Sequence, residues 1–466
     1  MQPILDITRA TDSYKGTHWL QYPPDTTNVY SYFESRGKPL SWSDYVVFFG
    51  LQYFLKQYLA GVVVTQEGLD KSAKRWAAHF GNDKLFNVAG WQHIIDKHGG
   101  KLPVSIQAVP EGSVVPTSTP LMTIENTDPE CYWLTNWLET ILVEVWYAST
   151  IATNSRGCKE ILHDALEKSG DLAGLPFKLH DFGFRGVSCP EQAALGGAAH
   201  LVNFQGTDTF IACNMLMDFY GCEMPGVSIP ASEHSTITAW GKEHELDAFR
   251  NMLNQYPTGL VACVSDSFDI MRAVEVYWGQ ELKDQILSRD GTLVVRPDSG
   301  ELPITVLQVL KGLGDAFGVE KNEKGYKVLP PQVRVIQGDG IDREMLGTIV
   351  RALLNSGWSI DNIAFGSGGG LLQKFNRDTL QFAFKCSWAK GKDYERDVYK
   401  DPVTSSAKKS KRGRFLVIRE QDGAWHTVPE RGNFITAGVP QLTEVFRDGE
   451  LLWDQSLAHI RERAEL

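Results

Sequence analysis

The sequence contains a histidine whose neighbours are suited to activating it. Glu233 directly precedes His234, and Asp266 lies in another short polar segment that follows an apolar run. A carboxylate that holds one imidazole nitrogen leaves the other as a nucleophile or a base. A structural histidine with satisfied hydrogen bonds is the alternative. Metal ligation is disfavoured because no ligand stands at i+3 or i+4. We therefore predict that His234, Glu233 and Asp266 form a catalytic group.

Two glycine-rich segments indicate a site for a phosphorylated sugar. The segment 365–370 reads FGSGGG and the segment 338–340 reads Gly-Asp-Gly, each after an apolar run. Glycines let backbone N–H groups approach an anion, and an aspartate between glycines can bind vicinal hydroxyls. The first segment fits neither a P-loop nor the Rossmann fingerprint. A tight turn at 365–370 and an Asx-turn at Asp339 are the alternatives.

Further polar segments predict a site for a planar ring that carries an amide. Phe182 offers an aromatic face close to Arg185 in the chain. Asp208 would accept a hydrogen bond from an amide NH2 but would repel a carboxylate. Arg296 and Asp298, separated by one proline, form either an ion pair or a phosphate site with a metal on the carboxylate.

These polar segments need a fold that brings the ends of many strands together. Each follows a short apolar or β-branched run, and a helical pattern follows each segment in turn. In parallel sheets of this kind, functional residues gather at the carboxyl ends of the strands. We therefore expect an α/β fold, an irregular TIM-like barrel, at 169–375, although loops are commonly polar for other reasons. The expected strands are 177–179, 201–204, 227–229, 260–264, 293–295, 333–336 and 363–365.

The two ends of the chain are expected to pack together as one discontinuous α+β domain, residues 1–168 and 376–466. Helical spacing is found at 45–59, 70–80 and 91–97, and a helical region runs from 128 to about 168. Short runs broken by proline and glycine predict a small antiparallel sheet at 104–125. Strand-like runs occupy 29–33, 380–388, 414–418 and 425–428, and a short helix is expected near 454–463.

Composition narrows the class of protein. The 466 residues have a net charge of −11, which argues against nucleic acid or an anionic membrane as a partner. The amino terminus lacks the pattern of a signal peptide, and no window of about 18 uncharged apolar residues occurs. The seven cysteines form no disulfide or zinc pattern. We expect a soluble protein of the reduced cytoplasm.

The motifs together resemble those of the nicotinamide phosphoribosyltransferases, which are type II phosphoribosyltransferases. The resemblance extends over nearly the whole chain. It rests on HDFGFRG at 180–186, GTD at 206–208, EHST at 233–236, VSDS at 264–267, RPDSG at 296–300, IQGDG at 336–340 and FGSGGGLLQK at 365–374, and on TDSYK at 11–15, TNVYSYFESR at 27–36 and NTDPECYWLTNW at 126–137.

The resemblance implies a reaction of NAD salvage, in which nicotinamide and phosphoribosyl pyrophosphate give nicotinamide mononucleotide and pyrophosphate. It implies a homodimer with shared sites, in which Phe182 and Tyr14 of the partner subunit sandwich the ring and Asp208 accepts from its amide. Residues implied in ring or phosphate binding are Arg185, Arg296, Gly338, Asp339, Gly368, Gly369, Arg377 and Lys385, with Arg36, Lys400 and Lys408 reaching over from the partner chain.

The same resemblance implies that ATP phosphorylates His234 and that hydrolysis of the phosphohistidine drives synthesis. Glu233 and Asp266 would then orient the imidazole, and Mg2+ would sit between Asp298 and the pyrophosphate. Two other functions stay open from the residues themselves. One is the same transfer to nicotinate, which Asp208 disfavours, and the other is a non-catalytic binding protein on the same scaffold.

Overall fold

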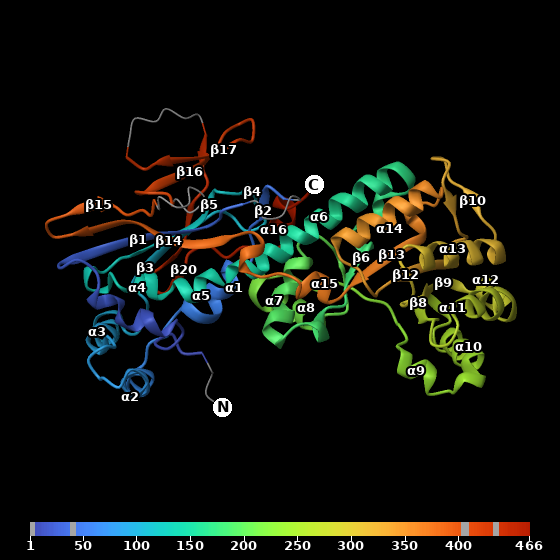
Figure 1. Ribbon diagram of the computed structural model, residues 1–466, viewed down its shortest axis with the longest axis horizontal. Helices are drawn as coiled ribbons and strands as arrows, with labels where there is room; N and C mark the ends of the chain where they lie inside the picture. Colours follow the sequence, from blue (N-terminus) through green and yellow to red (C-terminus); the bar gives the residue numbers. More distant parts are fainter. Residues whose placement is uncertain (1–4, 38–42, 402–409, 432–437) are drawn as a thin grey trace. The chain divides into compact units, whose positions relative to one another are not determined.

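The computed structural model describes residues 5–37, 43–401, 410–431 and 438–466, which pack into two compact units (Figure 1). The first unit comprises Met1–Thr153, Phe219–Gly221 and Phe375–Glu465. The second comprises Asn154–Asp218, Cys222–Lys374 and Leu466. Among the residues described, no helix has both the length and the apolar character needed to cross a membrane.

A parallel sheet forms the centre of the second unit. Its strand order is β7 (Gly206–Thr207), β6 (Leu179–Asp181), β13 (Ile363–Ser367), β12 (Val333–Gln337), β9 (Asp290–Arg296) and β8 (Thr258–Val264). Every neighbouring pair is parallel. The segment 227–231 makes a parallel bridge to each edge strand, through Val227 to Gly206 and through Ala231 to Ala262. Because these strands are parallel, their carboxyl ends all lie at the same edge of the sheet.

Helices alternate with these strands along the chain, as parallel connections require. In the chain, α13 comes after β9, and α14 connects β12 to β13. Both helices are drawn beside the sheet in Figure 1. The helices are α6 (Val145–Ser169), α7 (Pro190–His200), α8 (Phe210–Tyr220), α9 (His234–Thr238), α10 (Glu245–Gln255), α11 (Ile270–Arg272), α12 (Lys283–Leu287), α13 (Ile304–Phe317), α14 (Arg343–Asn355) and α15 (Gly369–Leu372), and a small hairpin joins β10 (Glu320–Lys321) to β11 (Lys327–Val328).

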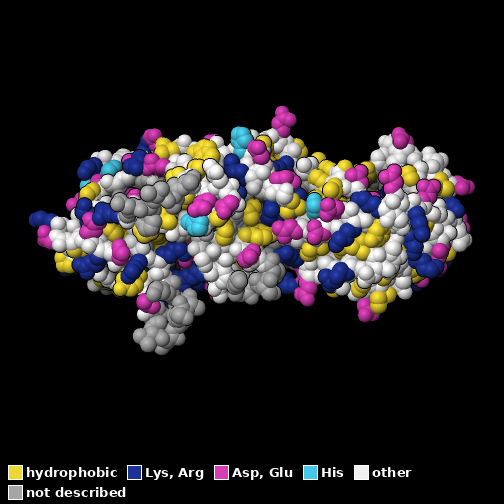
Figure 2. Space-filling model, turned by 90° about the horizontal axis from the view of Figure 1, so that it is seen from above, with side chains coloured by type: hydrophobic (Ala, Val, Ile, Leu, Met, Phe, Trp, Pro, Cys, Tyr) yellow, Lys and Arg dark blue, Asp and Glu magenta, His cyan; other side chains and the backbone are white. Residues whose placement is uncertain are grey.

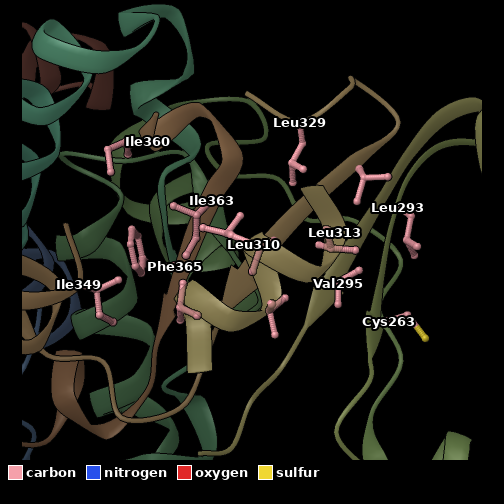
Figure 3. Packing of buried hydrophobic residues seen from close by; sticks show 14 of the residues in the cluster. Cys263, Leu293, Val295, Leu310, Leu313, Leu329, Ile349, Ile360, Ile363 and Phe365 are labelled. Atoms are coloured by element: carbon pink, nitrogen blue, oxygen red, sulfur yellow. The ribbon is translucent and has the colours of Figure 1, made fainter. Parts of the chain in front are cut away.

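The core of this unit lies between the sheet and its helices. Leu310 and Leu313 of α13 lie among strand residues that include Ile363 and Val295 (Figure 3). Phe365 of β13 is fully buried in the same cluster. Burying one such side chain contributes about 1.5–3 kcal/mol, so the apolar strands stabilise the scaffold that carries their polar ends.

Four of the expected strands are confirmed, with ends extended by a few residues, namely β8, β9, β12 and β13. The prediction at 201–204 was wrong, because Leu201, Val202 and Phe204 are buried in the turn that follows α7 and the strand begins only at Gly206. A short buried apolar run does not reveal whether it belongs to a strand or to a helix end. Similarly, Phe177 ends a 3₁₀ helix and the strand begins at Leu179. The run 227–229 forms a single bridge rather than a strand.

The first unit is built on an antiparallel sheet whose strands differ in length. Its strand order is β15 (Glu395–Asp397), β14 (Phe382–Gly391), β1 (Thr26–Ser35), β5 (Pro120–Asn126), β3 (Val104–Ala108), β19 (Thr443–Arg447) and β20 (Glu450–Leu451). Two smaller sheets pair β17 (Trp425–Pro429), β16 (Phe415–Arg419) and β18 (Val439–Pro440), and β2 (Tyr45–Val47) with β4 (Val114–Pro116). The strands expected in this part of the chain are thus present.

Helices of the first unit agree with the expected ones except at 45–59. That segment was expected to be one helix, but Tyr45–Val47 is a strand and the helix begins after Gly50, whose φ of +106° interrupts the pattern. The helical region after residue 128 is confirmed but divided. The helices are α1 (Leu51–Phe54), which continues as a π helix at Leu55–Leu59, α2 (Gln66–Phe80), α3 (Val88–His98), α4 (Leu134–Trp137), α5 (Glu139–Val143) and α16 (Leu457–Arg463), with 3₁₀ turns at Ser13–Leu20 and Pro129–Cys131.

Candidate functional site

A cavity of about 1130 Å³ opens at the carboxyl ends of the parallel strands. Most of the residues predicted from the polar segments line it together. They are Phe182 and Arg185 after β6, Asp208 after β7, Glu233 before α9, Arg296 and Asp298 at the end of β9, Gly338 and Asp339 after β12, and Gly368 and Gly369 after β13. The geometry confirms that the segments of these residues converge, whereas His234 and Asp266 are not among the residues that line this cavity.

Phe182 lies against glycine backbone. Its backbone N–H donates to the carbonyl of Ser367 at 2.9 Å, which continues the pairing of β6 with β13. A Cβ added at Gly366 would stand 2.0 Å from Cε2 of the Phe182 ring, and one at Gly338 would stand 3.3 Å from the same atom. At Gly366 only a residue without a side chain lets the ring take this place, whereas at Gly338 a side chain would be tight, so Gly366 above all determines where an aromatic ligand could stack.

A second, more enclosed cavity of about 430 Å³ adjoins the first. Apolar side chains of the sheet line it, among them Ala262, Val294 and Ile336, which pack as one cluster with Phe182. Phe182, Asp208, Ala231 and Arg296 line both cavities. They therefore mark a junction between a polar, glycine-rich space and an apolar one.

Asp208 is held at this junction by a residue that the sequence did not suggest. The hydroxyl of Ser228 donates to its carboxylate, and the backbone N–H of Asp208 donates to the carbonyl of Asp181 at 2.9 Å. Ser228 belongs to the segment that bridges both edge strands. The only sequence signal for it was its place within the expected run 227–229.

Asp181 is a second group whose role was not predicted. Its side chain is fully buried and accepts a hydrogen bond from the Gly183 N–H at 2.7 Å. Burial raises the pKa of Asp181 to about 7, and the hydrogen bond from Gly183 opposes that shift only in part. The turn that carries Phe182 is thus fixed by a carboxyl group that titrates near neutral pH.

His234 is the first residue of α9 and forms the predicted pair with Asp266. Nε2 of His234 lies 2.9 Å from Oδ1 of Asp266, and Oδ2 of Asp266 accepts from the Ser299 N–H at 2.8 Å. The Asp266 side chain is 4% exposed and that of His234 is 48% exposed. Since an ionised carboxylate only accepts, the neutral-ring tautomer that fits this contact has its proton on Nε2 and its lone pair on Nδ1.

Glu233 directly precedes α9 and lines the cavity. Its N–H donates to Oγ1 of Thr236 at 3.2 Å, and its carboxylate accepts from the hydroxyl of Ser235. These contacts fix the start of the short helix. They place His234 directly beside a residue of the cavity wall.

Arg296 and Asp298 face the same space. Nε of Arg296 lies 3.5 Å from Oδ1 of Asp298. Burial raises the pKa of Asp298, Arg296 opposes this shift, and Asp266 adds to it. Asp298 also adopts a φ of +47°, an uncommon conformation for a residue with a side chain.

The glycine cluster leaves room beside its backbone. At Gly369 an added Cβ would meet no atom of the described chain within 4 Å, whereas at Gly370 it would stand 2.5 Å from the carbonyl oxygen of Ile341. The first glycine therefore borders open cavity, and the second is needed for close packing. Nearby, Lys374 forms an ion pair with Asp342 at 2.5 Å.

The residues expected to act from a partner subunit lie in the first unit. Arg36 and Lys400 of this group line one cavity of about 670 Å³, together with Arg377 and Lys385, which were expected beside the ribose phosphate, and Glu139, which was not predicted. Burial lowers the pKa of Lys385, and Glu139 opposes the shift. Tyr14 is 59% exposed on the 3₁₀ turn Ser13–Leu20. Lys408 lies outside the described residues.

Elsewhere the surface is mixed in charge. On the face drawn in Figure 2, Lys and Arg side chains are interspersed with Asp and Glu. The face drawn therefore shows no broad area of one charge among the described residues.

The sequence is similar to known proteins over its whole length. The sequence model of the nicotinate phosphoribosyltransferase (NAPRTase) family matches residues 177–450, and that of the nicotinamide phosphoribosyltransferase N-terminal domain matches residues 6–106. A protein of Xanthomonas campestris pv. campestris named nicotinamide phosphoribosyltransferase is 48% identical, covering 100% of this chain and 99% of its own. One of Acinetobacter baylyi with the same name is 34% identical over 98% of this chain and 97% of its own.

Solved structures share the fold at lower identity. The nicotinate-nucleotide pyrophosphorylase of Pyrococcus furiosus has a TM-score of 0.63 at 18% identity, covering 100% of this chain and 97% of its own. Human nicotinic acid phosphoribosyltransferase has a TM-score of 0.56 at 18% identity, covering 97% and 92%. These two likenesses concern the fold alone.

Proposed function

This chain belongs to the nicotinate phosphoribosyltransferase (NAPRTase) family, and we propose that it transfers a phosphoribosyl group from phosphoribosyl pyrophosphate to nicotinamide. The products are nicotinamide mononucleotide and pyrophosphate, a step of NAD salvage. The observation that carries the proposal is the position of Asp208 beside Phe182, where the apolar cavity meets the glycine-lined one.

The ring of nicotinamide lies at that junction. Phe182 supplies one stacking face, and Tyr14 of the partner subunit supplies the other in a homodimer. The Asp208 carboxylate accepts a hydrogen bond from the amide NH2, and a nicotinate carboxylate at the same place would be repelled. Arg296 lines both cavities and therefore adjoins ring and sugar phosphate alike.

The sugar phosphate occupies the larger cavity. Asp339 binds ribose hydroxyls, while Gly338, Gly368 and Gly369 present backbone to the 5-phosphate. Arg185 adds a positive charge, with Arg377 and Lys385 as further phosphate-binding cations, and Arg36 and Lys400 of the partner subunit reach the pyrophosphate or ATP phosphates. Lys408 belongs to the same proposed set.

Transfer follows from this arrangement. The ring nitrogen of nicotinamide forms a bond to the anomeric carbon as the bond from that carbon to pyrophosphate breaks, and pyrophosphate leaves with the electron pair. Nicotinamide is a weak neutral nucleophile, so the protein acts mainly by holding the reactants in line and by stabilising the charge that develops on the sugar and on pyrophosphate.

Coupling to ATP is assigned to His234. Because Asp266 holds Nε2, Nδ1 attacks the γ-phosphorus of ATP and ADP leaves. Water later cleaves the N–P bond. Glu233 and Asp266 stabilise the charged imidazole, and hydrolysis at this position drives an otherwise weak synthesis.

Mg2+ is expected with pyrophosphate. The residues present fit such an ion, because the pKa of Asp298 is raised by burial and by the nearby carboxylates of Asp266 and Asp339, and a cation would relieve that repulsion. Asp298 would hold it. When bound, the ion would neutralise charge on the leaving group.

The finer description of the architecture is part of the same proposal. The two bridges of segment 227–231 support an irregular barrel closed by that segment. A cytoplasmic location is part of the same proposal, and the spacing of the cysteines in the sequence, which forms no CxxC pair and no zinc pattern, supports it.

A competition assay tests the proposal. Purified chain, Mg2+, ATP and phosphoribosyl pyrophosphate are incubated with equal concentrations of nicotinamide and nicotinate, and the two mononucleotides are separated and quantified. Preferred formation of nicotinamide mononucleotide is expected. Preferred formation of nicotinate mononucleotide would favour the alternative substrate, and neither product would favour a binding protein.

A further inference from the structure

Two histidines and an aspartate of the first unit converge on one point that the transfer reaction does not use. His93 and His98 lie on α3, and Asp128 caps the 3₁₀ turn Pro129–Cys131. Nε2 of His93 lies 2.9 Å and Nε2 of His98 lies 2.6 Å from Oδ2 of Asp128. We propose that His93, His98 and Asp128 form a binding site for a divalent transition metal ion of the Zn2+ type.

The carboxylate is held in place before any ion arrives. Oδ1 of Asp128 accepts from the Glu130 N–H at 3.0 Å. Its backbone carbonyl accepts from the Cys131 N–H at 2.9 Å and from Nδ2 of Asn126 at 2.8 Å. With its side chain only 5% exposed, Asp128 presents Oδ2 alone to the two imidazoles. One oxygen caps the turn and the other is a preoriented ligand.

The two imidazoles lie close to the carboxylate of Asp128 and are also partly exposed to solvent. Their ligand atoms and that of Asp128 all lie within 4.8 Å of one another. The side chains of His93 and His98 are 28% and 22% exposed, so an ion and a water molecule can reach them. Bonds of ~2.0–2.1 Å in a tetrahedral site separate neighbouring ligand atoms by about 3.3 Å. From the present 2.9 and 2.6 Å, the imidazole nitrogens would move away from Oδ2 by about 0.4 Å for His93 and about 0.7 Å for His98.

The donor set selects the class of ion. Two imidazole nitrogens and one carboxylate oxygen suit Zn2+ and its neighbours Co2+ and Ni2+, whereas Mg2+ and Ca2+ prefer oxygen throughout. The site is therefore distinct in chemistry from the Mg2+ site expected near Asp298. Three protein ligands leave a fourth position for water. An ion there would link the carboxyl-terminal half of α3 to the chain at residue 128.

Lys97 is the competing group. Its Nζ lies 3.5 Å from the same Oδ2, but its side chain is 62% exposed and can turn to solvent when an ion binds. Without an ion, the three basic side chains form an ion-pair network around one carboxylate. That network is the alternative that the experiment must exclude.

The test uses full-length protein freed of metal by a chelator and titrated with Co2+ in buffer that contains Mg2+. We expect one equivalent to bind with visible d–d absorption of a low-symmetry site. His93→Gln and His98→Gln should each weaken binding at least tenfold, and the double variant should lose the absorption. His163→Gln is the matched control, since the half-buried His163 lies with the exposed Asp164 and Glu167 in a second group of possible ligands on α6. It should bind as the wild type does.

Zn2+ supplies an independent readout. It should raise the Tm of the wild type and of His163→Gln but not that of the double variant. No stoichiometric Co2+ absorption, or absorption that persists in both single variants at wild-type affinity, would overturn the proposal and leave an ion-pair network. The single variants decide the matter even if the double variant does not fold. Neither result bears on nicotinamide transfer.

Discussion

Asp266 accepts from Nε2 of His234 at 2.9 Å with one carboxylate oxygen and from the Ser299 N–H at 2.8 Å with the other. The carboxylate is buried and the imidazole is half exposed. Asp266 therefore fixes the orientation of the imidazole through Nε2, and Nδ1 is left to act as the nucleophile. This relationship underlies the first prediction.

His234→Ala should abolish the stimulation of synthesis by ATP and leave slow basal transfer, because the residues that line the larger cavity are unchanged. The measurement is the initial rate of nicotinamide mononucleotide formation with and without ATP. His244→Ala, which removes an exposed histidine paired with Asp247, is the control and should keep the stimulation. A His234→Ala enzyme that still responds to ATP would mean that another residue accepts the phosphate.

Gly366→Ala should displace the Phe182 ring, because the new Cβ would stand 2.0 Å from it. We expect a raised KM for nicotinamide and a loss of about 1–3 kcal/mol in the free energy of unfolding. Steady-state kinetics and urea denaturation measure the two effects. Gly347→Ala, where the nearest atom is the end of the flexible Arg351 side chain at 3.3 Å, is the matched control. Equal KM values in the two variants would show that Phe182 does not contact the ring.

Asp181→Asn should change how stability depends on pH. The pKa of Asp181 is raised by burial to about 7 in the folded chain, above its unfolded value of about 3.9, so the folded state holds the proton more tightly. The proton on Asp181 therefore adds to the free energy of unfolding. This stabilisation is fully present below pH ~4 and is lost as pH rises through 7. The free energy of unfolding of the wild type minus that of the variant, measured by urea denaturation, should therefore fall by roughly 2 kcal/mol between pH 5 and pH 7. A constant difference would show that Asp181 is ionised throughout.

Mixed dimers should test the proposal that the chain is a homodimer in which each site is built from both subunits. Tyr14→Ala and Phe182→Ala homodimers should each be weakly active, since each lacks one stacking face. Dissociating and reassociating a mixture of the two would give dimers with one intact site, formed by Phe182 of one subunit and Tyr14 of its partner. We expect the rate of mononucleotide formation to rise above that of either parent. A rate equal to the mean of the parents would place both residues in one subunit's site.

Much of the scaffold could be predicted because the apolar residues near the carboxyl ends of its strands are mostly buried. The runs that became β8, β9, β12 and β13 are rich in valine, isoleucine and leucine, and each ends in a polar segment. The run 201–204 is equally apolar but ends a helix, and only tertiary packing distinguishes the two cases.

The site was predictable in its charged and glycine residues but not in its supports. Gly366 matters because the register of β13 with β6 places it opposite His180 and beneath Phe182, and no local pattern contains that register. Ser228 reaches Asp208 only because segment 227–231 joins both edge strands. Contacts between residues from different strands depend on the fold that brings them together.

The most direct test of amide recognition is the selectivity of Asp208→Asn. The measured quantity is the ratio of kcat/KM for nicotinamide to that for nicotinate, compared between the variant and the wild type. Removing the charge that repels a carboxylate should lower this ratio at least tenfold, which corresponds to ~1.4 kcal/mol. An unchanged ratio would contradict the account, because Asp208 would then have no part in distinguishing the two rings.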